Sequence, residues 1–189
     1  MSINAFSDGP YDFLFFQVIQ GKIYHHVVDI NRLEVFGLPI HPEWICLPLT
    51  AHDSQVAVYY HKHIGACFHI VVNHGVFHHP NILLFSLFNS VDKTTLYFIN
   101  LYQNPNRNAP VHLCNAVPCL LQFLSLLPSV HLIQGDFNVH CSYWDPDIEH
   151  DDPLGWSLIS ELTAIGLSLV NDDGDHTFSV LPIGLKFSI

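Results

Sequence analysis

A carboxylate and a carboxamide two residues apart, Asp136 and Asn138, stand where an apolar run meets a glycine. The run covers residues 130–133, and Gly135 follows shortly after it. A short apolar run bounded by Gly predicts a buried strand that breaks into a turn. Alternation along the chain would place Asp136 and Asn138 on one side and Phe137 in the core. Such a pair at a rigid strand end suits proton transfer, metal binding or substrate positioning.

The same four letters also fit an ordinary turn, because Gly, Asp and Asn all favour turns. The longer string favours the functional interpretation. After the motif come His140 and then Trp144-Asp145-Pro146. Together these residues resemble the endonuclease/exonuclease/phosphatase superfamily, and in particular the endonuclease domain of non-LTR (LINE-like) retrotransposons.

This resemblance implies an α/β fold, a four-layer sandwich of two mixed β-sheets flanked by helices. It also implies that Asp136 would act on the attacking water or the leaving group, and that Asn138 would hold the scissile phosphate. Asp136 would be a ligand of Mg²⁺, with Mn²⁺ as an alternative. The implied partner is DNA, and the parent element would work in the nucleus. The reverse transcriptase of such an element is not in this chain.

Two further segments match the same family. Asn100-Leu101-Tyr102 ends an apolar stretch before a Pro-bearing turn, and in the family this Tyr contacts the scissile phosphate. An aromatic residue packed at a strand end is the structural alternative for Tyr102. The segment His176-Thr177-Phe178-Ser179 matches the family's Thr-Phe strand. The resemblance implies that Tyr102 and Thr177 support charge in the transition state.

Two departures from the family pattern concern the active site. An early family strand ends in Gln-Glu-Pro, and its Glu holds the metal; here Gln17 is followed by Val18, which offers no oxygen ligand. The family also ends in Ser-Asp-His, whereas residues 185–189 contain neither Asp nor His, so we expect a C-terminally truncated fold. We therefore expect weak or no nuclease activity. The alternatives are a non-catalytic mobile-element remnant or weak binding module, and a phosphodiesterase or phosphatase for a small substrate.

The charge balance bears on the expected partner. The chain has six Lys and Arg against 17 Asp and Glu, a formal net charge of -11. Phosphate binding depends on Lys and Arg, and neutral histidines add little attraction. We therefore expect any DNA binding to be weak.

The chain is long enough, at 189 residues, for one domain with a real core, which we place at residues 11–189 behind an extension of residues 1–10. A hydrophobic content of 49% excludes disorder as the main state. Periodicity and turn signals predict the elements that position the motifs. The expected strands are residues 11–17, 44–49, 55–61, 66–72, 82–88, 96–102, 130–133 and 167–171, and the expected helices are 111–127 and 154–165.

Other sites are less well supported. The five cysteines are odd in number and form no Cys-x-x-Cys, so reduced thiols in an intracellular protein are expected. No apolar run is long enough to span a bilayer and no signal peptide is visible. His61 and His63 would share a strand face, but no third metal ligand follows from their spacing, so we interpret the histidine clusters as surface or packing residues. The acidic residues at 145–152 lack calcium-loop spacing, and a solvated loop is the better account.

Overall fold

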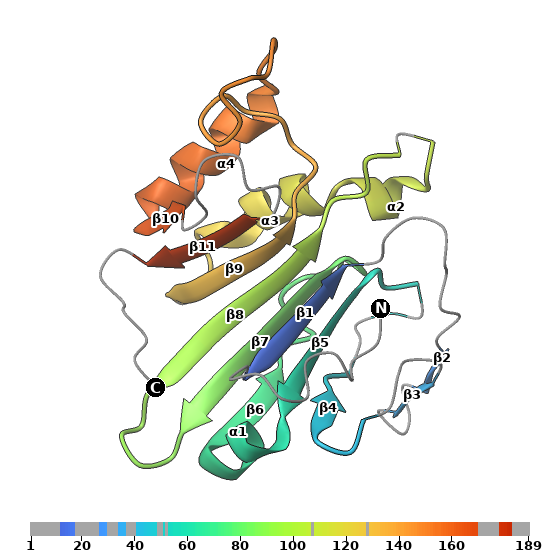
Figure 1. Cartoon of the computed structure of the whole chain (residues 1–189), viewed down its shortest axis with the longest axis vertical. Coiled ribbons are helices and arrows are strands. Elements are labelled where there is room, and N and C mark those ends of the chain that lie inside the picture. Colours follow the sequence, from blue (N-terminus) through green and yellow to red (C-terminus); the bar gives the residue numbers. More distant parts are fainter. Residues whose placement is uncertain are drawn as a thin grey trace.

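Figure 1 presents the computed structural model of the chain. It describes residues 12–17, 27–29, 34–36, 41–48, 51, 53–106, 108–127, 129–169 and 178–182. Two sheets pack face to face, and helices cover the outer side of the larger sheet. Within these residues, no helix combines the length and the apolar character that crossing a membrane requires.

The larger sheet contains six described strands in the order β10-β11-β9-β8-β7-β6. Their bounds are β6 (Phe68–Val72), β7 (Ile82–Asn89), β8 (Thr95–Tyr102), β9 (Val130–Asp136), β10 (Leu167–Leu169) and β11 (Phe178–Pro182). All neighbours pair antiparallel except β8 and β9, which run parallel. A parallel pair needs a long crossover, and here it contains α2 (Val111–Cys114) and α3 (Ala116–Leu124). The carboxyl ends of β8 and β9 therefore lie at the same edge of the sheet (Figure 1).

The smaller sheet has the order β1-β5-β4, with β1 (Phe13–Gln17), β4 (Trp44–Cys46) and β5 (Val56–His61). Its described strands pair antiparallel, so the mixed pairing lies in the larger sheet. A separate hairpin joins β2 (Val27–Asp29) to β3 (Glu34–Phe36). In Figure 1, β1 crosses in front of the larger sheet, while α3 lies behind that sheet and α4 (Pro153–Ala164) lies at its upper edge. The expected α/β fold of two packed sheets flanked by helices is confirmed.

Strand β7 shows why the larger sheet occupies the middle of the molecule. Ile82 and Leu84 point to the helices, and Leu83 and Phe85 point to the smaller sheet. Each of these four side chains is at most 2% exposed. A strand that is covered on both faces should read as a continuous apolar run, which is what its sequence contains. Burying each such side chain contributes roughly 1.5–3 kcal/mol.

Two local predictions were wrong. His61 and His63 were expected to share a strand face, but Lys62 and His63 open helix α1 (Lys62–Cys67), because the His61 ring accepts a hydrogen bond from the amide of His63 and caps it. The strand expected from residue 66 consequently begins at Phe68. In strand β5, Tyr59 is only 2% exposed, because a third apolar cluster covers its face of the smaller sheet.

Both expected helices are present, and the first is divided into two. The helix expected at residues 111–127 is split at Asn115 into α2 and α3, which places Pro118 in the first turn of α3, where a missing amide is tolerated. The second helix, α4, begins at Pro153 with Asp152 as its cap, whose carboxylate accepts from the amide of Leu154 over 2.8 Å. It is followed by Gly166 at φ 81°, a left-handed conformation that glycine commonly adopts after a helix.

Candidate active site

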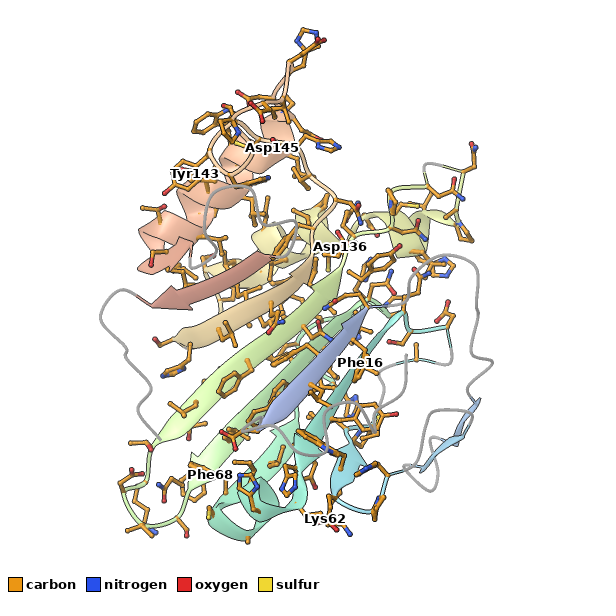
Figure 2. All side chains as sticks on the ribbon, in the orientation of Figure 1. Phe16, Lys62, Phe68, Asp136, Tyr143 and Asp145 are labelled. Atoms are coloured by element: carbon orange, nitrogen blue, oxygen red, sulfur yellow. The ribbon has the colours of Figure 1, made fainter. Side chains whose placement is uncertain are left out.

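Tyr102 and Asp136 are direct neighbours at the carboxyl ends of β8 and β9. They are paired in the parallel register of these strands, so their side chains leave the sheet on the same face. Asp136, labelled in Figure 2, is exposed at the end of its strand. Tyr102 is only 3% exposed, because its ring packs in the apolar cluster between the two sheets. The structure thus brings a solvated carboxylate beside a mostly buried phenol.

Asn138 is fixed in the same place by its main chain and its side chain. Its amide N–H donates to Oδ1 of Asp136 over 3.2 Å, which closes a tight Asx turn. Its side-chain Nδ2 donates to the main-chain oxygen of Gln103 over 2.8 Å. The residue has φ 43°, a left-handed conformation that Asn tolerates better than most residues. Between these two polar residues, Phe137 is 3% exposed in the helix-side core, as alternation predicted.

Gln103 is the positioning residue that sequence reasoning missed. Its main chain donates to the carbonyl of Asp136 over 2.8 Å, and its side chain accepts from the amide of Val117, in the first turn of α3, over 2.9 Å. The side-chain nitrogen also donates to the carbonyl of Cys114. The sequence places Gln103 next to Tyr102 and before a Pro-bearing turn, which predicted only the turn. Its contacts tie the strand ends to the crossover helices.

Gly135 has a different role from the one expected. It lies within β9, which runs on to Asp136, so the residue is part of the strand and not of a turn. A Cβ built at Gly135 would stand 1.9 Å from the main-chain oxygen of Leu101. Only glycine permits this approach of the two strands. The close contact holds the ends of β8 and β9 together and thereby sets the position of Tyr102 relative to Asp136.

The environment of Tyr102 keeps its phenol protonated. Burial raises the pKa of Tyr102 above its ordinary value, and the nearby charge of Asp136 raises the pKa further. Both effects disfavour the phenolate, since it would be a second negative charge in a poorly solvated place. The hydroxyl of Tyr102 is therefore a hydrogen-bond donor or acceptor, and not a nucleophile or a base, around neutral pH.

A network of side-chain amides joins the segments that adjoin Tyr102. Asn81, which is 0% exposed, accepts from the amide of Tyr102 at its carbonyl over 3.0 Å. Its side chain donates to Oε1 of Gln55 over 2.9 Å and accepts from the Gln55 amide over 3.0 Å. Asn104 donates to the same Oε1 over 3.2 Å. The start of β5, the start of β7 and the segment after β8 are therefore joined by polar contacts.

Gln17 and Asn100 meet across the two sheets. Nε2 of Gln17 donates to Oδ1 of Asn100 over 2.7 Å, and Nδ2 of Asn100 donates to the carbonyls of Ala57 and Phe16 over 3.1 Å and 3.3 Å. Asn100 is fully buried, so these bonds satisfy a costly polar group. Val18 and Thr177, the other two expected site positions, lie outside the described residues.

The described residues offer a divalent cation few oxygen ligands. Among them, no group of three or more His, Cys, Asp or Glu side chains could hold a metal ion. Mg²⁺ commonly binds one or two carboxylates and takes waters and substrate phosphates for the rest. The exposed carboxylate of Asp136 meets that minimum.

Comparison with solved structures places this geometry in a known fold. The endonuclease domain of TRAS1, a telomere-specific non-LTR retrotransposon, superimposes with a TM-score of 0.54 at 14% identity, covering 74% of this chain and 67% of that one. A humanized D. rerio TDP2 gives a TM-score of 0.48 at 12% identity, covering 89% of this chain and 59% of that one. A D. rerio TDP2 complexed with a single-strand DNA product gives 0.42 at 11% identity, covering 89% and 58%. No family model matches the sequence, and no curated protein matches it significantly. The similarity to the TRAS1 domain shows that the chain shares the fold of that endonuclease domain.

Proposed function

We propose that this chain is a retrotransposon-type DNA endonuclease domain that hydrolyses phosphodiester bonds slowly with the help of a divalent cation. The observation that carries the proposal is the pairing of Tyr102 with Asp136 at the shared edge of β8 and β9, with Asn138 bound to the same edge. The fold supports it, since a retrotransposon endonuclease domain has the same architecture. The carboxylate, amide and phenol are the groups that phosphoryl transfer requires for positioning and charge stabilisation.

The three side chains would divide the work according to their surroundings. The carboxylate of Asp136 is exposed and would accept a proton from the attacking water. Asn138 has one side-chain N–H engaged with Gln103, which leaves the other N–H for a phosphate oxygen. Tyr102, kept protonated by its raised pKa, would donate its hydroxyl hydrogen to developing negative charge on the phosphate. Thr177 would add a further donor, as the family resemblance implies.

Mg²⁺ or Mn²⁺ would be held by Asp136 together with the phosphate of the substrate. When bound, the cation would neutralise charge that develops on the phosphate oxygens. Because one carboxylate holds it weakly, we expect half-maximal activity only at millimolar Mg²⁺.

Two features of the sequence limit the expected rate. Val18 occupies the position of the family's metal-binding Glu, and the net charge of -11 opposes binding of a polyanion. Removing a single transition-state donor already lowers kcat by roughly 100- to 1000-fold. We therefore expect nicking that is slow, and that weakens steeply as the salt concentration rises.

The test is a nicking assay on supercoiled plasmid with Mg²⁺ or Mn²⁺. The wild-type chain should produce open circles, and Asp136→Asn should not. The matched control is Asp147→Asn, an exposed acidic residue in the following loop, which should nick at the wild-type rate. Equal rates for the wild type and Asp136→Asn would overturn the proposal, whether those rates are measurable or zero.

A non-catalytic module is the second candidate, favoured by the small exposed fraction of Tyr102, which is 3%. In that case the wild type and Asp136→Asn would raise the fluorescence anisotropy of a labelled single-stranded oligonucleotide equally, and neither would cleave it. A third outcome, turnover of a small phosphodiester without plasmid nicking, would indicate a phosphodiesterase for a small substrate. The three outcomes are distinguishable with the same two proteins.

A further inference from the structure

A pair of histidines occupies the end of the smaller sheet that is farthest from the candidate active site. His61 is the last residue of β5, and His63 lies in the first turn of α1. The first residue of β5, in contrast, adjoins Gln55, whose side chain belongs to the amide network beneath Tyr102. In Figure 2, the neighbouring Lys62 lies at the bottom of the molecule and Asp136 in its upper half. Nothing in the proposed hydrolysis uses these two imidazoles.

The ring nitrogens of the pair converge. Nδ1 of His61 and Nδ1 of His63 are 2.5 Å apart, which is closer than an ordinary hydrogen bond between two nitrogens. The rings lie 4.5 Å apart between centroids at an angle of 44°. In this geometry one Nδ1 can donate its N–H to the other, and a metal ion bound by both nitrogens would take the place of that proton.

Each ring also has a neighbour on the side away from the other ring that holds it in place, as the rings of metal-binding histidines do. Nε2 of His63 lies 2.7 Å from Oδ1 of Asp12, just before β1. Histidines that bind a metal through one nitrogen usually donate the other N–H to a carboxylate, which fixes the ring and makes it a better ligand. The ring of His61 stands edge-on to Trp44, 5.2 Å away at 89°, so it is also held in place. Both rings are therefore oriented by neighbours that leave their Nδ1 atoms facing each other.

We propose that His61 and His63 bind a divalent transition-metal ion, such as Zn²⁺, through their Nδ1 atoms, with Asp12 as the residue that positions His63. Imidazole nitrogen suits Zn²⁺, Cu²⁺ and Ni²⁺ and does not suit Mg²⁺. No third His, Cys, Asp or Glu joins the pair among the described residues, so water or an external ligand completes the coordination. The site is thus open and chemically distinct from the magnesium site proposed at Asp136.

The pair can open far enough to admit the metal. Two nitrogens bound tetrahedrally to Zn²⁺ at about 2.0–2.1 Å stand roughly 3.4 Å from each other. The rings must then separate by somewhat less than one ångström from their 2.5 Å contact. His63 is 54% exposed at its side chain, so its ring has room to move. His61 must also release the amide of His63, a long bond of 3.3 Å.

The test is a Zn²⁺ titration of the metal-stripped, full-length protein in competition with a chromophoric chelator. The wild type should bind one equivalent of Zn²⁺ that the His61→Ala/His63→Ala variant lacks, and millimolar Mg²⁺ should not displace it. Asp12→Asn should weaken this site by tenfold or more, the usual effect of losing such a carboxylate. The matched control is His74→Ala/His78→Ala, two exposed histidines in the loop before β7, which should retain the wild-type site.

Two readings decide the result. All four metal-free proteins should unfold cooperatively when followed by circular dichroism, so that a lost site is not a lost fold; the midpoint of the paired variant should be somewhat lower, because His61 also caps α1. If a variant of the pair unfolds, His61→Gln and His63→Gln, which keep polar groups of similar length, replace it in the titration. The proposal is overturned if the paired variant and the wild type bind Zn²⁺ with equal stoichiometry and affinity.

Discussion

Asn138 donates its side-chain amide to the main-chain oxygen of Gln103 over 2.8 Å, which links the segment after β9 to the segment after β8. Gln103 in turn donates its own amide to the carbonyl of Asp136 over 2.8 Å. The ends of two parallel strands are therefore joined by bonds in both directions beyond the last residue pair of the sheet. This arrangement holds the carboxylate and the carboxamide of the motif in one place without any help from a ligand.

The left-handed conformation of Asn138 predicts a difference between two substitutions. Asn138→Ala removes the bond to Gln103 and also places an alanine at φ 43°, so it should lower the free energy of unfolding by about 2–3 kcal/mol. Asn138→Gly removes the same bond but tolerates the backbone angle, and should lose about 1 kcal/mol less. Urea unfolding followed by circular dichroism measures both. Equal stabilities would show that the backbone at this position is not strained.

The close approach at Gly135 predicts a severe effect of a single methyl group. Gly135→Ala would place a Cβ 1.9 Å from the oxygen of Leu101, so β8 and β9 must separate. We expect a loss of about 3 kcal/mol or more in unfolding free energy, or failure to fold. The control is Gly75→Ala, where an added Cβ has no atom within 4 Å and should change stability by less than about 0.5 kcal/mol. A Gly135→Ala protein as stable as this control would contradict the strand geometry.

Asn100 forms hydrogen bonds between the two sheets, and these bonds predict the effect of an apolar substitution at this position. Asn100→Leu leaves Nε2 of Gln17 and the carbonyl of Ala57 without their partner in the interior. We expect a destabilisation of about 2–4 kcal/mol, because each buried polar group that loses its bond costs about 1–3 kcal/mol. Asn108→Leu, at an exposed position, is the control and should be nearly neutral in the same chemical denaturation. A neutral result at Asn100 would mean that the two sheets do not depend on this contact.

His79 predicts a dependence of stability on pH. Burial lowers the pKa of His79 below its ordinary value, and its ring accepts from the amide of Asn81 at Nδ1 over 3.0 Å while Nε2 meets Asn115. The unfolded chain therefore binds this proton more readily, so the stability that His79 contributes is lost as pH falls below about 6.5. His79→Gln, which keeps a donor and an acceptor but does not titrate, should lose less stability between pH 7.5 and pH 5. Parallel pH profiles of the two proteins, measured by urea unfolding, would refute this assignment.

Local signals in the sequence were sufficient for much of the scaffold. The apolar run of β7 and the amphipathic pattern of α4 depend on residues a few positions apart, and both elements were predicted. The Asp136 and Asn138 motif was likewise recognisable, because its residues lie two positions apart and alternate with a core phenylalanine. Interactions between residues that are close in the sequence can be predicted from local sequence patterns.

The tertiary structure alone decided how these parts meet. The bond between Gln17 and Asn100 spans 83 positions and that between Asn138 and Gln103 spans 35, so no local pattern encodes them. Gly135 read as a turn residue because glycine favours turns, whereas its actual constraint is the backbone of a neighbouring strand. The convergence of His61, His63 and Asp12 also depends on β1 pairing with β5. The sequence by itself determined which polar side chains are available. The packing of the two sheets determined which of these side chains stand within hydrogen-bonding distance. The physical reason is that contacts between distant segments form only when the apolar faces that carry them are buried together.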